Sequence, residues 1–402
     1  MQSPANDARR AFLIIGIIFV AFNLRPAITS VGPLIPFIRN DLGISNGVAG
    51  FITTLPLLSF AALSPLAPKI GKRISNERTI FLGLILLAVG IGIRSIGLIE
   101  TLLLGTFLIG LGVAICNVLL PSIVKERYPT KVGVVTSVYS TSMGIFAASA
   151  SGVSVPLAQT FGLGWQTSLA IWAALAFIAL LLWSPQLGKQ NKIGQIRQTV
   201  QKRQSLLRST LAWQVTLFMG LQSFLFYCTI AWLPDILHSQ GITVAAAGWL
   251  LAIMQFAGLP STFITPMLAD KLSNQKGIVV TVSFLYIIGL VGLFISSNLM
   301  FAVLSVIFIG FAQGSSISLS LAFLSLRAAD ASEAASLSGM AQSFGYLLAA
   351  VGPIFIGFLF DKTLSWTASM MTLVIVAVAM CGAGIGAGRN EFVSVPSKGE
   401  SS

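Results

Sequence analysis

Long apolar runs separated by short polar turns follow one another along the whole chain. A helix needs about 20 mostly apolar residues to cross the hydrocarbon core of a bilayer. We predict an all-α membrane protein with twelve spanning helices, because twelve segments reach that length. These segments are 11–38, 46–68, 78–97, 101–124, 132–158, 165–184, 213–237, 244–268, 278–296, 299–324, 336–359 and 366–387.

The first apolar run begins after Arg9 and Arg10, an arrangement that a signal peptide shares. No small-residue cleavage site follows, and the run continues past Arg25 to Phe37. We therefore interpret this run as the first spanning helix.

One long polar stretch interrupts the pattern between the sixth and the seventh predicted spans. It occupies 185–212 and contains six basic residues and no acidic residue. We predict that it is a cytoplasmic linker between a first six-helix bundle at 1–184 and a second at 213–402.

The two halves repeat each other in sequence. A shift of 198 residues places several turn and loop residues of the first half on identical or similar residues of the second, and a shift of 200 extends the match. The matched pairs are Pro36 with Pro234, Gly43 with Gly241, Arg73 with Lys271, Ser75 with Ser273 and Arg127 with Arg327. Six spans restore the original direction, so the two bundles are parallel repeats, an arrangement that resembles the major facilitator fold.

Composition and charge agree with a membrane protein. Hydrophobic residues make up 55% of the chain and charged residues 9%, whereas a soluble domain has about 25% charged residues. The net charge of +12 would suggest nucleic acid in a soluble protein. Here 20 of the 24 Lys and Arg residues fall in the termini or in the loops of one side, which is a topology signal.

This charge bias predicts that both termini are cytoplasmic in a multi-pass protein of the bacterial inner membrane. Its expected partners are membrane lipids and a small-molecule substrate, with no nucleic acid, and we expect a monomer. Four basic residues lie elsewhere: Arg39, Arg94 and Lys362 on the opposite side, and Arg25 within a predicted helix.

Catalytic and metal-binding signatures are missing from the sequence. The three cysteines lie in apolar runs without metal-ligand spacing, and no phosphate-binding G-x-x-x-x-G-K-[ST] motif is present. We expect no enzymatic activity, no cofactor and no metal. All twelve acidic residues fall in termini, loops or helix ends, which weakens, without excluding, a proton as the coupling ion.

Arg25 lies at the midpoint of the first predicted span. A charge at that depth costs at least about 2.5–3.5 kcal/mol on insertion scales, and such residues commonly serve function. Either Arg25 binds helix carbonyls, or it is a fixed positive charge for an anionic or strongly polar substrate. Thr29 shares its helical stripe, whereas Asn23 joins it only if Pro26 distorts the helix.

Further polar residues lie deep in apolar runs. Each one either links helices by hydrogen bonding or faces the substrate, and together they suggest a polar central site. The candidates are Asn117, Tyr139, Gln222, Tyr227, Gln255, Gln342 and Tyr346.

Several stretches resemble one transporter family over nearly the whole chain. NLRPAITSVGPLIP at 23–36 is similar to the first helix of cyanate transporters, and TTLPLLSFAALSPLA at 53–67 and LSGMAQSFGYLLAAVGP at 337–353 resemble 2-nitroimidazole exporters. The resemblance implies a major facilitator of the cyanate/2-nitroimidazole transporter family. The family's Asn-x-Arg-Pro, Tyr-Ser-x-x-Met and Gln-x-x-Gly-Tyr elements then begin at Asn23, Tyr139 and Gln342.

The resemblance also implies gating residues. The superfamily's acidic and basic signature between the second and third helices is degraded at 69–78, which lacks the acid, whereas 267–277 keeps Asp270 and Lys271. We expect Asp270 to stabilise the outward-facing form near the start of the eleventh helix. The expected gating residues are Asp270, Lys271, Arg73, Arg127 and Arg327.

The function favoured by these observations is secondary active transport by alternating access of a small anionic or polar solute such as cyanate. The alternative is efflux of 2-nitroimidazole-like toxic compounds. A membrane-bound enzyme would need a cluster of reactive side chains, and the sequence shows none. A channel would need a continuous pore, which the two-half repeat does not favour.

Overall fold

The protein, described here by a computed structural model, forms helices throughout the part of the chain that the structure describes. That part comprises residues 4–64, 66–128, 132–187, 206–295, 298–328 and 331–393. Twelve helices within it are long and apolar enough to cross a membrane, which confirms the predicted fold class. Most of the predicted basic linker, from 188 to 205, lies outside the described residues.

The first half supplies six of these spans, three of which consist of more than one helical segment. Its elements are α1 (Pro4–Asn23), α2 (Pro26–Thr29), η1 (Gly32–Leu34), α3 (Ile35–Leu42), α4 (Asn46–Leu63), α5 (Ala67–Ile74), α6 (Asn76–Arg94), α7 (Ile99–Arg127), α8 (Val132–Val155), η2 (Pro156–Thr160), α9 (Gly164–Ala170), α10 (Ala173–Trp183) and η3 (Ser184–Gln186).

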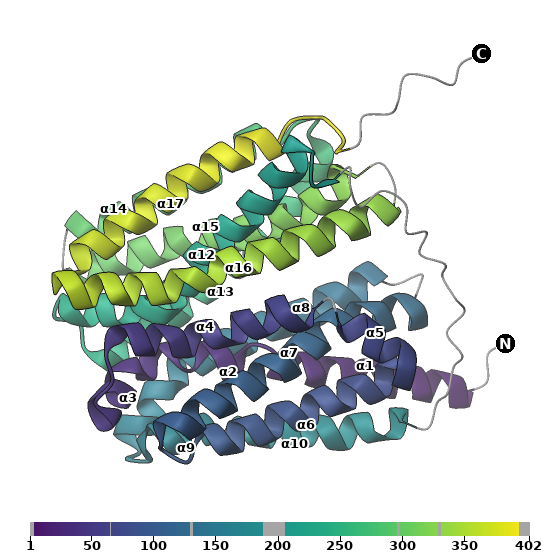
Figure 1. Cartoon of the computed structure of the whole chain (residues 1–402), viewed down its shortest axis with the longest axis horizontal. Helices are drawn as coiled ribbons and strands as arrows, with labels where there is room; N and C mark the ends of the chain where they lie inside the picture. Colours follow the sequence, from purple (N-terminus) through teal and green to yellow (C-terminus); the bar gives the residue numbers. More distant parts are fainter. Residues whose placement is uncertain are drawn as a thin grey trace. The chain divides into compact units, whose positions relative to one another are not determined.

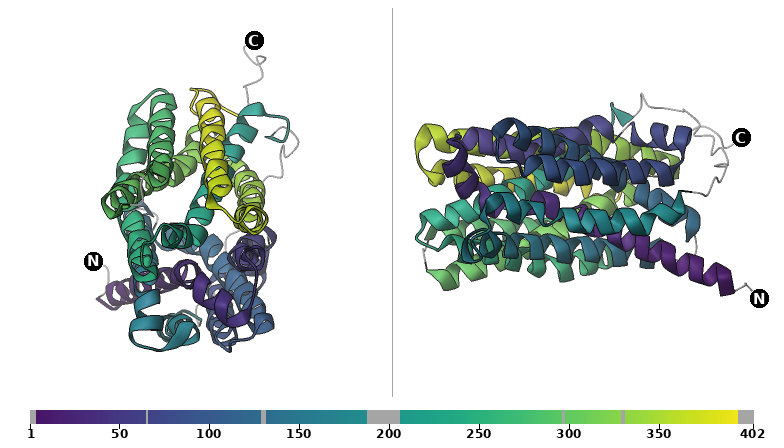
Figure 2. Two further views of the ribbon diagram at one scale, coloured as in Figure 1. Left: turned by 90° about the vertical axis from the view of Figure 1, so that its left-hand side faces the viewer. Right: turned by 90° about the horizontal axis from the view of Figure 1, so that it is seen from below.

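The second half consists of longer, continuous helices. They are α12 (Thr210–Ser239), α13 (Val244–Lys271), α14 (Lys276–Ile295), α15 (Leu299–Leu326), α16 (Ala331–Thr363) and α17 (Trp366–Ala387). Among the described elements of this half, α14 and α15 pack closely, as α6 and α7 do in the first half (Figures 1 and 2). The third and fourth spans of each half thus form equivalent pairs.

The first span differs from the expectation of one helix over 11–38. It extends to Leu42, and it is broken after Asn23 and again between Thr29 and Gly32. Pro26 and Pro33 lack the backbone N–H that an uninterrupted helix would use, so breaks at these positions have a direct cause. Arg25 therefore lies in the first break and not within a regular helix.

Two of the matched glycines end equivalent helices. Gly43 follows α3 with φ of 64°, and Gly241 follows α12 with φ of 90°. This left-handed conformation is open to glycine at no steric cost, so each glycine allows the chain to turn back into the next span. The conformations agree with the repeat that the sequence shift predicts.

Contacts divide the described chain into two compact units. The first contains 1–193, 227–256 and 350–366, and the second contains 194–226, 257–349 and 367–402. The first unit therefore includes the whole first half together with parts of α12, α13 and α16. We call the end of this unit that carries the turns 43–45, 95–98, 240–243 and 364–365 the far end.

Candidate functional site

The break between α1 and α2 presents Arg25 at mid-span. Arg25 precedes the first residue of α2 and has φ of −115° and ψ of −43°. Its carbonyl oxygen accepts hydrogen bonds from the backbone N–H groups of Ile28 and Thr29, both at 2.9 Å. The side chain is half-buried. A permanent cation is thus placed within a membrane span, at a point where the helix is interrupted.

Asn23 takes part in helix packing. Its side-chain amide donates to the carbonyl oxygen of Phe19 at 2.7 Å and to that of Leu175 on α10 at 3.2 Å. The residue is 3% exposed. The amide group thereby ties the end of α1 to α10, and a direct contact of Asn23 with substrate stays a prediction.

Thr29 and Gln255 are brought together through a third residue. The Thr29 hydroxyl donates to the Ala147 carbonyl at 3.0 Å. The Ser151 hydroxyl donates to the Thr29 carbonyl at 3.2 Å and accepts a hydrogen bond from the Gln255 amide at 2.7 Å. This chain of polar contacts joins α2, α8 and α13.

Arg94 is a functional candidate that the sequence analysis missed. We counted it only as a basic residue of the side opposite to the basic loops, but it is the last residue of α6 and is completely buried. Its Nη1 donates at 2.6 Å to the carbonyl of Ala27 on α2, while Nε and Nη2 have no partner among the described residues. The sequence already contained the signal for this residue, which is a charged side chain inside the predicted span 78–97.

Two phenylalanine rings lie beside the break. The rings of Phe22 on α1 and Phe146 on α8 stack with centroids 3.9 Å apart and an interplanar angle of 21°. Both residues are half-buried, and Phe22 precedes Arg25 by three residues. A cation and one member of a half-buried aromatic pair therefore occur within three residues of each other along the chain, on either side of the end of α1.

The remaining predicted residues are distributed over both units. In the second unit, the Gln222 amide donates to the Ser223 hydroxyl at 2.7 Å, and the Gln342 amide donates to the Ser338 hydroxyl at 2.9 Å. The other predicted residues are buried Tyr139 and Tyr227 and half-buried Asn117 and Tyr346. Their participation in one site with Arg25 stays a prediction.

At the far end, backbone from the two halves meets directly. A Cβ atom added to Gly32, Gly50 or Gly357 would clash with the Ile230, Pro353 or Asn46 carbonyl group, respectively. The Thr54 hydroxyl donates to the Ala350 carbonyl at 2.9 Å, and the Trp232 indole N–H donates to the Pro353 carbonyl at 2.9 Å. These contacts leave no room for a solute between the segments that make them.

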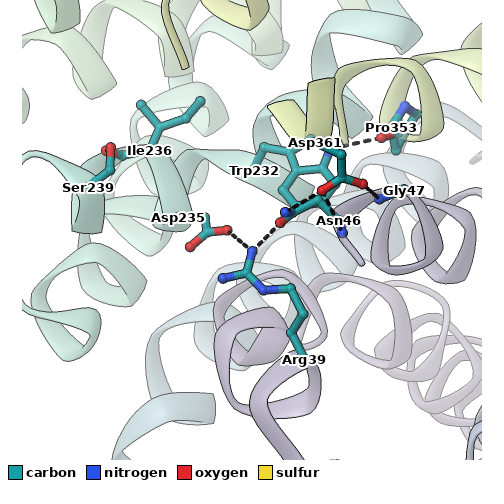
Figure 3. A network of polar contacts seen from close by, with 9 residues as sticks. All are labelled: Arg39, Asn46, Gly47, Trp232, Asp235, Ile236, Ser239, Pro353 and Asp361. Carbon is teal, nitrogen blue, oxygen red and sulfur yellow. Dashed lines mark hydrogen bonds and ion pairs between the residues drawn. The ribbon is translucent and has the colours of Figure 1, made fainter. Parts of the chain in front are cut away.

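A polar network shares residues with this close packing, and Figure 3 shows its contacts. Arg39 of α3 pairs with Asp235 of α12 at 3.0 Å and also donates to the side-chain oxygen of Asn46. The Asn46 amide donates to Asp361 of α16 at 2.7 Å, and the Gly47 backbone N–H donates to the same carboxylate at 2.8 Å. Sequence reasoning noted the charged members as residues of helix ends, but their pairing depends on tertiary structure.

The predicted gating residues have different environments. Arg127 pairs with Glu77 at 2.7 Å, and the buried Arg327 contacts the side-chain oxygen of Gln275. The partners Glu77 and Gln275 were missed, although the 198-residue shift that matches Ser75 with Ser273 also matches them. The other predicted gating residues, Asp270, Lys271 and Arg73, are exposed, and the side chains at the start of α16 lie outside the described part.

The architecture is that of a polytopic helical membrane protein with two repeated halves and a charged residue at a break in its first span. A family model described as the Major Facilitator Superfamily matches residues 11–353 and 219–387. The chain belongs to this superfamily, and it is a membrane transporter and not an enzyme. The predicted family is thereby confirmed.

Three relatives match nearly the full chain. The Bacillus subtilis uncharacterized transporter YycB is 55% identical over 98% of both chains. The Escherichia coli 2-nitroimidazole transporter is 39% identical over 98% of this chain and 99% of its own. The Escherichia coli cyanate transport protein CynX is 26% identical over 86% of this chain and 89% of its own.

Solved structures share the fold. A bacterial homologue of the human lysosomal transporter Spinster, in an inward-facing and unoccupied conformation, matches with a TM-score of 0.75 at 16% identity. The match covers 97% of this chain and 98% of that one. At this identity the likeness supports the fold alone.

Proposed function

We propose that the protein is a secondary carrier that moves a small, planar, polar solute of the 2-nitroimidazole type by alternating access. The observation that carries this proposal is the placement of half-buried Arg25 at the break between α1 and α2, three residues after Phe22 of the Phe22–Phe146 stack. A guanidinium offers a planar fork of donors to paired oxygens such as those of a nitro group. An aromatic face favours a flat ring.

The likeness to the 2-nitroimidazole transporter supports this substrate class, because that protein is 39% identical over 98% of this chain. The break itself gives the substrate access to backbone N–H and C=O groups that a regular helix would keep hydrogen-bonded internally. In carriers with repeated halves, interrupted helices commonly contribute to the substrate site near mid-membrane.

A small anion such as cyanate is the second candidate. The fixed positive charge of Arg25 favours an anion, and the cyanate transport protein is 26% identical over 86% of this chain. Cyanate has no ring to stack on Phe146. Transport of 2-nitroimidazole should therefore depend on the aromatic pair, whereas transport of cyanate should not. Transport of either solute should depend on Arg25.

Uptake by proteoliposomes separates these candidates. We expect wild-type protein to take up labelled 2-nitroimidazole, and Arg25→Ala to reduce uptake at least about tenfold, since losing one member of a desolvated charged contact costs about 2–5 kcal/mol. Arg25→Lys keeps the charge but loses the fork, so we expect weak residual uptake. Phe146→Ala should weaken 2-nitroimidazole uptake by up to about tenfold, the value of one aromatic contact.

The matched control is Arg78→Ala, which removes an exposed arginine from the first turn of α6. This variant should transport normally. Cyanate uptake that is insensitive to Phe146→Ala but abolished by Arg25→Ala would favour the anion candidate. Undiminished uptake of both solutes by a well-folded Arg25→Ala protein would contradict the assignment of Arg25 to the site.

The same proposal includes the orientation and the oligomeric state of the carrier. The excess of basic residues in the termini and in one set of loops supports cytoplasmic termini in the bacterial inner membrane. With that orientation the far end faces the outside. We further propose that the carrier works as a monomer.

A further inference from the structure

We propose that Arg94 is a positioning residue of the substrate site. Its guanidinium binds the Ala27 carbonyl of α2, which the second break in the first span frees, and it thereby holds α2 and the attached Arg25 in place. The inference rests on the proposed function for the claim that Arg25 contacts substrate. The hold on α2 is a separate statement, and its test needs no solute.

The Ala27 carbonyl needs a partner from outside its own helix. In a continuous helix the Val31 N–H would donate to this carbonyl. Because the span is broken after α2, the Val31 N–H donates to the Ile28 carbonyl at 3.3 Å. A carbonyl without a partner is costly within a membrane, and Arg94 Nη1 supplies one at 2.6 Å. The guanidinium therefore stabilises the broken form of the span, since a regular helix would already have bonded this carbonyl.

Helices α6 and α7 fix the position of Arg94. It is the last residue of α6, where the helix dipole favours a cation. A Cβ atom added to Gly105 of α7 would lie 2.4 Å from the Arg94 backbone nitrogen and 2.7 Å from its Cα. Glycine thus permits a close approach of the two helices at this point. A closely packed helix pair presents the guanidinium to α2.

The charge of Arg94 has few partners for a completely buried group. Nη1 contacts the Ala27 carbonyl, whereas Nε and Nη2 have no partner in the described part of the chain. No carboxylate among the described residues pairs with this guanidinium. Burying a cation in this way disfavours folding, and a methionine would fill much of the same volume without that cost. Packing alone therefore does not account for an arginine here, whereas the bond to Ala27 requires a long donor.

A hold on α2 is also a hold on Arg25, because hydrogen bonds join the two. The Arg25 carbonyl accepts from the N–H groups of Ile28 and Thr29, both at 2.9 Å. The Thr29 hydroxyl donates to the Ala147 carbonyl of α8 at 3.0 Å. Contacts from α6 and from α8 thus keep the segment in place. Removal of Arg94 leaves α2 with its contacts to α8 and without the one from α6.

Hydrogen exchange without solute tests the hold on α2. Purified protein in lipid nanodiscs is labelled with deuterium, and mass spectrometry compares a peptide that covers 26–34 with one from α14. We expect Arg94→Met to speed exchange in 26–34 at least about tenfold, since it removes a hydrogen bond from a charged donor and so eases local opening. The α14 peptide should keep its wild-type rate. Arg94→Lys retains one charged donor and should give a smaller increase.

The matched control is Arg327→Met, which removes another buried arginine whose side-chain contact with Gln275 lies in the second half. It should leave the exchange of 26–34 at the wild-type rate. Unchanged exchange of 26–34 in Arg94→Met overturns the proposal. If Arg94→Met loosens every helix alike, Arg94→Lys decides the matter. An increase confined to 26–34 in that variant supports the hold on α2, and any other result overturns it.

Uptake kinetics test the effect on the substrate site. Misplacing Arg25 weakens binding, so we expect Arg94→Met to raise the KM for 2-nitroimidazole by about tenfold, with a smaller change in the maximal rate. In an Arg25→Ala background, Arg94→Met should change the residual uptake little, because it acts through Arg25. Equal effects in the two backgrounds overturn the positioning role. If the wild type does not take up 2-nitroimidazole, the proposed substrate fails, while the exchange rates still decide whether Arg94 holds α2.

Discussion

Two equivalent regions of the repeated halves are stabilised by different chemistry. In the first half, Arg127 at the end of α7 pairs with Glu77 at the start of α6, at 2.7 Å. In the second half, Arg327 at the end of α15 contacts Gln275, just before α14. One arginine has a carboxylate partner, and its counterpart has a neutral amide.

The second arginine is stabilised by more numerous, neutral contacts. Arg327 is 2% exposed and lies 5.7 Å from the centroid of the Phe323 ring. Burial lowers its pKa, an effect that nearby Glu391 opposes. The Gln275 amide donates to the Ala269 and Leu272 carbonyls, both at 2.9 Å, so the glutamine that faces Arg327 is itself fixed.

The difference teaches that the repeat preserves the position of the arginine but not the way it is compensated. The first half uses a charge pair, which a competing charge can break. The second half uses a fixed hydrogen-bonded network, to which the Arg327 carbonyl adds a bond from the Val393 N–H at 2.8 Å. We infer that the ion pair is the more easily switched of the two.

The largest expected effect comes from Arg127→Met. This change leaves Glu77, whose side chain is 10% exposed, without its charged partner. Breaking a buried pair from one side costs about 3–5 kcal/mol, and the 21% exposure of the Arg127 side chain places the effect near the lower end. Thermal unfolding of the purified protein in detergent measures the loss.

Glu77→Gln combined with Arg127→Met supplies the control. If the pair is a genuine interaction, the double variant should be less destabilised than the two single variants added together. Strict additivity would show that Arg127 stabilises the protein by packing alone.

Arg327→Met should have a smaller effect, of about 1–3 kcal/mol, because it leaves one buried amide oxygen of Gln275 unsatisfied and no buried charge. Methionine can also occupy part of the apolar volume beside Phe323. The same unfolding assay applies. A loss larger than that of Arg127→Met would reverse the proposed difference between the halves.

Gln275→Glu gives Arg327 of the second half a carboxylate partner, as Arg127 has in the first half. The new carboxylate gains an ion pair with Arg327 but can no longer donate to the Ala269 and Leu272 carbonyls. We expect a net loss of about 1 kcal/mol, since a missing donor leaves buried acceptors unpaired. A clear increase in stability would show that those two bonds contribute little.

Ser209→Ala gives the smallest expected effect, at about 0.5–1 kcal/mol. It removes the hydroxyl that donates to the Val393 carbonyl at 3.2 Å and accepts weakly from the Ala212 N–H at 3.4 Å. Limited proteolysis after Arg389 should become faster while the midpoint of unfolding changes little. Unchanged proteolysis would show that this bond does not hold the segment around Val393.

The fold was predictable because its signals are local or repetitive. Apolar length defines the spans, and shifts of 198 and 200 residues reveal the repeat, down to the turn glycines Gly43 and Gly241. The break at Pro26 was anticipated as a distortion, but its effect on Arg25 was not, because a proline can kink a helix or interrupt it.

The contacts of the candidate site were harder to predict, because they join residues that are distant in sequence. Arg94 was counted only as a topology signal, yet its guanidinium contacts the Ala27 carbonyl on α2. Arg39 and Asp235 are separated by almost half the chain, and no local pattern pairs them. Charge near a helix end is ordinarily solvated, so only tertiary structure distinguishes the buried cluster.

Counterflow in proteoliposomes tests the central claim, that the protein is a carrier with alternating access, most directly. Vesicles are loaded with unlabelled 2-nitroimidazole and diluted into a trace of labelled solute, with protein-free vesicles as the control. A carrier should accumulate label transiently above its equilibrium level, because the internal solute accelerates the return of the binding site. Label that only equilibrates, or single-channel currents from the same preparation, would contradict the account.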